Sequence, residues 1–252
     1  MIMHQGLFIG NKTLKLKEVN STNSYLKELI ATNDKELEGL VVVAENQVLG
    51  RGQKGTVWES ENGKNLTLSI FLKPNVMVLN QFIISKVISL GIVSFLKDLG
   101  LNNLKIKWPN DIYCNNKKIA GILIENSLKG NKINRSVVGI GLNVNQLNFQ
   151  SENGPTSIAK ELKNDKQNLT ELLDGLLFFI DKTYINLKLG KETEINTNYL
   201  DNLYWINEFR SFRKGNHLIE GSILGVDQIG KLQIKINNKI ETFGLKEISF
   251  FR

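Results

Sequence analysis

Six short segments of the chain are rich in β-branched or alternating apolar residues and are bounded by Gly, Asn or Pro, the pattern typical of β-strands. They cover residues 13–19, 40–46, 65–72, 104–108, 118–126 and 135–145. Other segments place apolar residues at three- and four-residue spacing, which predicts helices. These cover residues 22–31, 78–99, 170–189 and 194–203, and Ser21 or Thr22 is the expected N-cap of the first.

The pattern changes near residue 209, where short alternating strands are separated by turns at 214–216, 227–230 and 237–238. The order of mixed strands and helices, then helices, then strands predicts an α+β fold. We expect a mixed-sheet catalytic domain over 1–206 and a small C-terminal β-barrel domain over 207–252. Strands that follow one another without helices argue against a doubly wound nucleotide fold, and the sequence has no GxxxxGK[ST] phosphate loop.

The composition limits the kind of protein. A chain of 252 residues, 41% of them hydrophobic, can bury one sizeable core and a small appendage. No run approaches the roughly 18 uninterrupted apolar residues of a membrane helix, and the first residues lack the order of a signal peptide, so we expect a cytoplasmic protein without membrane association. One cysteine, Cys114, and two histidines, His4 and His217, exclude an internal disulfide and a cysteine-cluster metal site.

The formal charge of +7 favours acidic partners such as nucleic acid, ATP or an acidic protein surface, without choosing among them. The lysines are scattered between Asn and apolar residues, which is more typical of a solvated surface. We find neither a recognition helix nor a basic stripe with interleaved aromatic residues, so no nucleic-acid partner is expected.

Residues 44–58, AENQVLGRGQKGTVW, leave a predicted strand and combine three glycines with two cations and an indole. Glycine removes the side chain that would block an approaching anion, and the guanidinium of Arg51 offers a fork of donors. The segment is typical of an anion-binding lid. It is equally typical of a solvated hairpin with a basic tip.

Residues 107–111, KWPND, end a predicted strand abruptly at proline. Strand alternation places Lys107 and Trp108 on opposite faces. A buried lysine needs a partner, so Lys107 is a candidate for binding a phosphate or a carboxylate. The alternative is a lysine on an edge strand beside a turn.

Two further predicted strands contain glycines, KIAGILIE at 118–125 and GIGLNVN at 139–145. Small residues within strands leave room for a flat ligand against the sheet, or mark bulges. Asn143 and Asn145 alternate with apolar residues and so share one face, where their amides either serve a ligand or end the strand.

These segments together resemble biotin protein ligases in order and approximate spacing. The resemblance rests on STN at 21–23, GRGQKG at 50–55 ahead of Trp58, KWPND, KIAGILIE and GIGLNVN, and a weaker similarity occurs near 245–250. It implies a mixed sheet related to class II aminoacyl-tRNA synthetases, followed by a small SH3-like C-terminal domain.

The resemblance also implies the residues that contact the substrates. The implied biotin set is Ser21, Thr22, Asn23, Gln47, Gly50, Arg51, Gly52, Lys107 and Gly121. Trp58 resembles the tryptophan that stacks on adenine in this family, and Lys118 and Asn143 fall where family members contact the phosphates. Arg51, Lys107 and Lys118, with Mg²⁺, are the implied catalytic cations, and no metal ligand among the residues is predicted.

The implied reaction activates biotin with ATP to biotinyl-5′-AMP and transfers biotin to a lysine of a biotin carboxyl carrier protein, by a monomer or a homodimer. The sequence departs from the family in two ways. The STN element begins at residue 21, which leaves no room ahead of it for a winged-helix DNA-binding domain, so a repressor role is not expected. Gln53, Lys54 and Thr56 stand where arginines are common, which puts in question how tightly the adenylate is retained.

The main rival interpretation is a lipoate ligase or an octanoyltransferase, which shares the fold. A transferase of that kind needs a cysteine nucleophile beside a lysine. Cys114 is expected in a turn after KWPND and is interpreted as a bystander.

Overall fold

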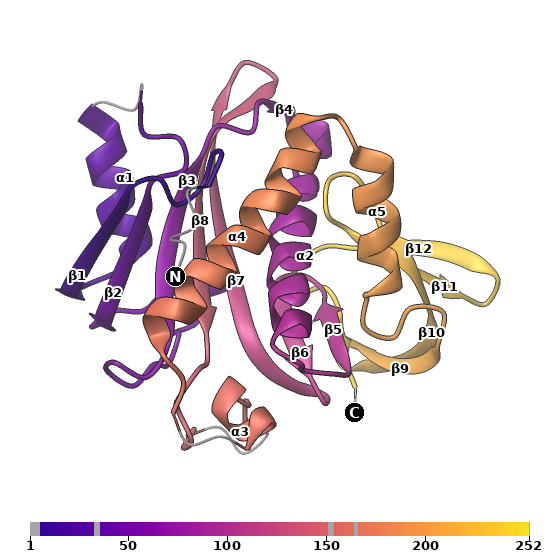
Figure 1. Cartoon of the computed structure of the whole chain (residues 1–252). Coiled ribbons are helices and arrows are strands. Elements are labelled where there is room, and N and C mark those ends of the chain that lie inside the picture. Colours follow the sequence, from indigo (N-terminus) through magenta and orange to yellow (C-terminus); the bar gives the residue numbers. More distant parts are fainter. Residues whose placement is uncertain (1–5, 33–35, 151–153, 164–165, 252) are drawn as a thin grey trace.

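The computed structural model describes residues 6–32, 36–150, 154–163 and 166–251, and its centre is a large mixed sheet (Figure 1). Across the sheet the strands follow the order β1 (Thr13–Val19), β2 (Val41–Gln47), β3 (Leu66–Leu72), β8 (Lys132–Leu142), β7 (Lys117–Lys129), β6 (Asp111–Cys114) and β5 (Leu104–Lys107). The short β4 (Val76–Met77) pairs with β8, and only the β1–β2 pair is parallel among the pairs of the described strands.

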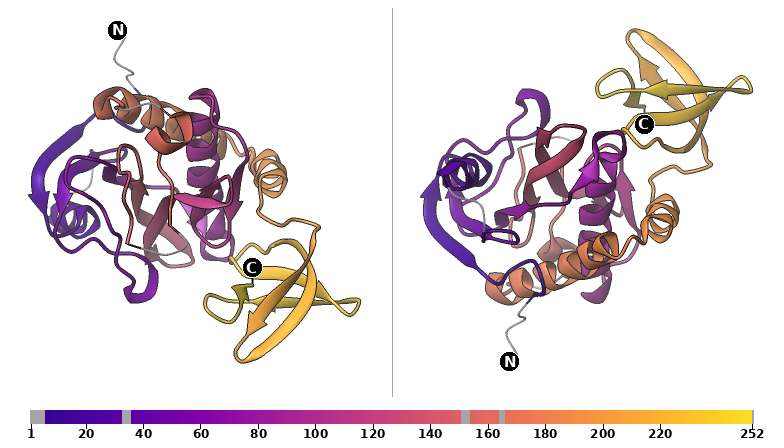
Figure 2. Two further views of the ribbon diagram at one scale, coloured as in Figure 1. Left: turned by 90° about the horizontal axis from the view of Figure 1, so that it is seen from below. Right: turned by 90° about the horizontal axis from the view of Figure 1, so that it is seen from above.

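Helices cover both faces of this sheet, and successive residues of each strand point to opposite faces. On one face α2 (Phe82–Asp98) and α4 (Leu169–Lys188) pack against each other, with α5 (Glu192–Asp201) beside α2 (Figures 1 and 2). On the other face α1 (Thr22–Thr32) buries Leu26 and Ile30 against Val42, Phe71 and Val137. The short α3 (Ile158–Leu162) follows the end of β8.

Helix α2 has the composition of a membrane helix and the surroundings of a core helix. The segment Val78–Asp98, which includes α2, is long and apolar enough to cross a membrane. Its most apolar stretch has a mean hydropathy of 1.7, yet 67% of that stretch is buried inside the protein. Apolar residues all around a helix are expected where both the sheet and another helix cover it. Its hydrophobicity is therefore explained by its place between the sheet and α4.

The C-terminal strands form a second, antiparallel sheet beside the main body (Figure 2). Its order is β12 (Lys239–Phe243), β11 (Leu232–Ile236), β10 (His217–Val226), β9 (Phe209–Lys214) and β13 (Ser249–Phe250). The indole Nε1 of Trp108 donates to the carbonyl of Gly230 at 2.9 Å and so links the two sheets. The predicted α+β fold is confirmed. The boundary at 206/207 stays a prediction. Ile206, on its N-terminal side, forms a β-bridge with Ile223 of the second sheet.

One local prediction is wrong. Cys114 does not lie in a turn but is the last residue of β6, and its side chain is buried. β5 and β6 form a hairpin that turns at residues 108–110, and strands of four residues are too short to show a recognisable period.

Candidate functional site

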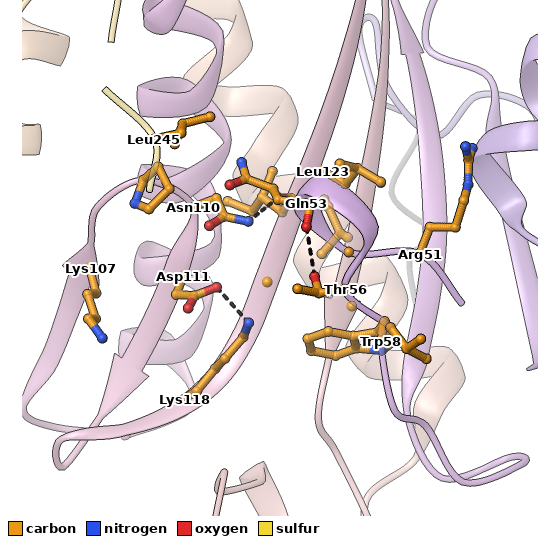
Figure 3. Close-up of a pocket in the computed structure, with 18 of the residues that line it drawn as sticks. Arg51, Gln53, Thr56, Trp58, Lys107, Asn110, Asp111, Lys118, Leu123 and Leu245 are labelled. Atoms are coloured by element: carbon orange, nitrogen blue, oxygen red, sulfur yellow. Dashed lines mark hydrogen bonds and ion pairs between the residues drawn. The ribbon is translucent and has the colours of Figure 1, made fainter. Parts of the chain in front are cut away.

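A pocket of about 480 Å³ opens on the face of the sheet that carries α1. Its walls come from the 50–58 loop, the β5–β6 hairpin, strands β7 and β8, and the C-terminal segment 245–250 (Figure 3). The predicted site residues that line it are Ser21, Thr22, Asn23, Gln47, Arg51, Gly52, Trp58, Lys107, Lys118 and Gly121. Residues from all five motifs of the sequence, including Gly139 and Gly141 of GIGLNVN, thus meet around one cavity, as expected of a small-molecule site.

Hydroxyl and amide groups form one end of the pocket. The side-chain oxygen of Gln47 accepts hydrogen bonds from the backbone N–H of Thr22 at 2.8 Å and from its hydroxyl at 3.1 Å. The hydroxyl of Ser69 lies 2.7 Å from that of Thr22 and donates to Oδ1 of Asn23 at 2.5 Å. Because the oxygen of Gln47 already accepts two bonds, its NH₂ group is the end left to donate to a ligand.

A carboxylate next to this end binds three donors. Oε2 of Glu125 accepts from Nδ2 of Asn23 at 2.9 Å and from Nη2 of Arg51 at 3.3 Å, and Oε1 accepts from Nζ of Lys27 at 2.9 Å. Burial by itself would raise the pKa of the Glu125 carboxyl. The hydrogen bonds from Lys27 and Asn23 and the charge of Arg51 outweigh burial and lower that pKa, so the carboxylate is ionised at neutral pH.

The glycine-rich loop is a hydrogen-bonded hairpin. Gly52 N–H donates to the carbonyl of Thr56 at 2.7 Å, and Trp58 N–H donates to that of Gly50 at 3.0 Å. A 3₁₀ turn at Gln53–Gly55 closes its tip. Backbone bonds therefore tie the positions of Arg51 and Trp58 to each other.

The indole of Trp58 lies against two glycines on neighbouring strands. Gly121 and Gly141 face each other across β7 and β8. A Cβ on Gly141 would come within 2.2 Å of Trp58 Cε2, and one on Gly121 within 3.0 Å of Cζ3. Only glycine permits this approach. Within the described part of the chain, the buried Nε1 of Trp58 has no hydrogen-bond partner.

Two lysines lie at the other end of the pocket, away from the guanidinium of Arg51 (Figure 3). Lys118 pairs with Asp111 at 2.7 Å, and its Nζ lies 5.4 Å from the Trp58 ring centroid. Lys107 donates to the hydroxyl of Tyr113 at 3.2 Å. The structure thus brings Lys107 and Lys118 together but leaves Arg51, the third predicted cation, with Glu125.

The C-terminal segment completes the pocket, which the sequence pattern did not predict. Leu245, Lys246, Ile248, Ser249 and Phe250 line the pocket. The Nζ of Lys107 lies 4.9 Å from the ring centroids of both Phe250 and Tyr113, so its ammonium lies over an aromatic face from each sheet. The one sequence signal for this segment was the weak family similarity at 245–250.

Two predicted residues do not line the pocket. Gly50 lies at the base of the hairpin, where a Cβ would come within 2.6 Å of the Trp58 carbonyl oxygen. Asn143 is buried, and its Nδ2 donates to the carbonyl of Thr156 at 3.0 Å. Thr156 N–H in turn donates to the carbonyl of Lys118 at 2.8 Å, so the observed contacts of Asn143 support the strand that carries Lys118.

Acidic and imidazole groups do not cluster at the pocket. Among the described residues no group of three or more His, Cys, Asp or Glu could hold a metal ion. Asp111 lines the pocket and is paired with Lys118, and His4 lies outside the described residues.

A pocket with two lysines at one end and an amide-rich end at the other, on a helix-covered mixed sheet, defines a protein that binds a small anionic ligand. A family model described as "Biotin/lipoate A/B protein ligase family" matches residues 16–143. The chain belongs to this family.

Curated relatives and solved structures are similar to this chain, some over most of its length and others over less than half of it. The Bifunctional ligase/repressor BirA of Bacillus subtilis is 28% identical over 233 residues, which cover 88% of this chain and 69% of that protein. The Biotin–[acetyl-CoA-carboxylase] ligase of Paracoccus denitrificans is 37% identical over 108 residues, 41% of this chain and 43% of that protein. Biotin protein ligase from Aquifex aeolicus in complex with biotin and ATP superposes with a TM-score of 0.76 at 27% identity, covering 96% of this chain and all of that one.

Proposed function

We propose that the protein is a biotin protein ligase, which activates biotin with ATP and transfers it to a lysine of a biotin carboxyl carrier protein. The observation that carries this proposal is the pocket itself, which has an amide-rich end and a two-lysine end. Between the two ends, the indole of Trp58 lies against Gly121 and Gly141. The family membership and the similarity to biotin ligases along 96% of the chain support it.

The amide-rich end suits the uncharged ring system of biotin. Ser21, Thr22, Asn23 and Gln47 present hydroxyl and amide groups to the pocket, and the bonds described above fix the orientations of Thr22, Asn23 and Gln47. A urea-like group needs both donors and acceptors, and fixed polar groups distinguish it from a purely apolar acyl chain.

The two-lysine end suits the reacting groups. The biotin carboxylate attacks the α-phosphorus of ATP, so that a C–O–P bond forms and pyrophosphate leaves. Two anions must approach each other, and we assign Lys107 and Lys118 to neutralise that approach. Arg51 joins them only if the 50–58 hairpin moves, since its guanidinium pairs with Glu125.

Trp58 and the glycine strands suit the nucleotide. We assign to Trp58 the stacking surface for adenine, because an aromatic face beside Lys118 accommodates a base next to its phosphates. The product of the first step is a mixed anhydride that water would hydrolyse, so closure of the 50–58 hairpin would protect it. The amine of the acceptor lysine then attacks the carbonyl, and AMP leaves.

Mg²⁺ is expected to accompany ATP rather than to be held by a cluster of side chains. The described residues offer no triad of acidic or imidazole ligands, and Mg²⁺ binds ATP mainly through phosphate oxygens and water. When bound, the ion would add positive charge at the phosphates. Asp111 is the acidic side chain of the pocket that could contact its water shell.

Lipoate or octanoate chemistry remains the second candidate, because the family model covers both ligase types. The chain's cysteine does not suit a thiol nucleophile. Cys114 is 1% exposed, and its Sγ lies 3.4 Å from the carbonyl of Asn102. It is absent from the residues that line the pocket.

Transfer of labelled biotin to a purified carrier domain tests the proposal. In the presence of labelled biotin, ATP and Mg²⁺, the protein should label the carrier domain. A carrier domain whose acceptor lysine is replaced by arginine should stay unlabelled. Labelling of the domain by lipoate or octanoate in place of biotin would contradict the proposal.

A further inference from the structure

Glu125, which was not among the predicted site residues, extends the floor of the pocket toward α1. It follows Gly121 and Leu123 along β7, and both of these residues line the pocket. The register between β7 and β8 is regular through this stretch, so strand alternation places all three on the same face. The side chain of Glu125 is 27% exposed. A movement of the 50–58 hairpin would therefore change the contacts of its carboxylate.

The contact with Asn23 fixes the orientation of an amide at the pocket wall. Because Oδ1 of Asn23 accepts the hydroxyl proton of Ser69, its Nδ2 must donate elsewhere. Nδ2 is 2.9 Å from the Glu125 carboxylate and 3.4 Å from the carbonyl of Leu123. The charged and closer acceptor dominates.

The contact with Arg51 fixes the hairpin. The two side chains are 43% and 27% exposed and share a single hydrogen bond, so the ion pair alone contributes at most about 1 kcal/mol. Its effect on geometry is larger, because the backbone bonds of the hairpin make Arg51 and Trp58 move as a unit. The Arg51–Glu125 ion pair, although weak, therefore sets the position of the whole 50–58 hairpin.

We propose that Glu125 is a positioning residue for biotin, whose carboxylate holds Asn23 and Arg51 in the arrangement that receives the ligand at the amide-rich end. This inference rests on the proposed function. In this arrangement Glu125 neutralises the charge of Arg51 beside the uncharged part of biotin. Lys107 and Lys118 are then the cations that act on the reacting groups.

A double-mutant cycle, with biotin affinity measured by calorimetry, tests the inference. Glu125→Gln keeps the size of the side chain and an acceptor for Asn23 but removes the charge that binds Arg51. We expect the dissociation constant for biotin to rise about fivefold in the wild-type background, about 1 kcal/mol. In an Arg51→Met background the same substitution should change it less than twofold. A coupling of less than about twofold would overturn the proposal.

Two controls separate this role from general stability. Lys27→Met removes another partner of the same carboxylate and should leave biotin affinity within twofold. Glu45→Gln, at an exposed position on β2, should have no effect. A Lys27→Met effect equal to that of Glu125→Gln would show that the carboxylate acts through α1 and would overturn the proposal. Failure of the wild type to bind biotin would instead contradict the proposed function.

Discussion

At the scale of single residues, Lys107 is the cation whose surroundings are most specific. Its ammonium faces two aromatic rings and the Tyr113 hydroxyl at the wall of the pocket. Lys107→Ala should lower biotin-dependent adenylate formation at least about tenfold, because charge builds up where its ammonium lies. Pyrophosphate exchange measures this step. Lys105→Ala, on the same strand but outside the residues that line the pocket, should remain close to wild type, and equal rates in the two variants would refute the assignment.

Cys114 distinguishes the ligase from a thiol-dependent acyltransferase. Burial, followed by the charge and hydrogen bond of Glu161, raises the pKa of its thiol to about 12. At pH 8 only about one molecule in ten thousand would carry the reactive thiolate. Cys114→Ser should therefore keep biotin transfer within about twofold, and a thiol reagent should modify the native protein only after unfolding. Loss of transfer in a folded Cys114→Ser protein would favour the acyltransferase.

At the scale of elements, strand β8 carries two glycines that serve different ends of the pocket. A Cβ on Gly141 would displace the Trp58 indole, whereas a Cβ on Gly139 would come within 2.5 Å of Oδ1 of Asn23. Gly141→Ala should raise the KM for ATP at least about fivefold with little change for biotin, and Gly139→Ala should do the reverse. Steady-state exchange kinetics separate the two constants. If both variants raised the KM for the same substrate, the assignment of ATP to the Trp58 side of the pocket and of biotin to the Asn23 side would be wrong.

The elements were largely predictable because the six strands and four helices each have a clear period or clear bounding residues. The site was predictable where a motif lies on one element, as with Lys118 and Gly121 on β7. It was not predictable where contacts cross between distant segments. Glu125 lies within a recognised motif, yet its partners come from α1 and the hairpin. The short strand that ends at Cys114 has too few residues for a period.

At the scale of the whole molecule, the second sheet supplies part of the active pocket. Phe250 places its ring over Lys107 and also contacts the aromatic cluster of Trp205 and Phe212. Phe250→Leu keeps most of the apolar volume but loses the aromatic face, and cation–π contacts are worth about 0.5–2 kcal/mol. Adenylate formation should fall about two- to tenfold, measured against Phe209→Leu, an exposed position of the same sheet. Equal activity of the two variants would show that the C-terminal sheet does not act on Lys107.

The central claim is that this molecule activates biotin in a pocket with one amide-rich and one cationic end. ATP–pyrophosphate exchange measured with biotin, lipoate and octanoate in turn tests that claim most directly, because it reports the adenylation step without needing the carrier. The account predicts exchange with biotin at least about a hundredfold above exchange with either other acid, since fixed polar groups at the amide-rich end would be left without partners by an apolar chain. Exchange with lipoate or octanoate equal to or faster than with biotin would contradict it.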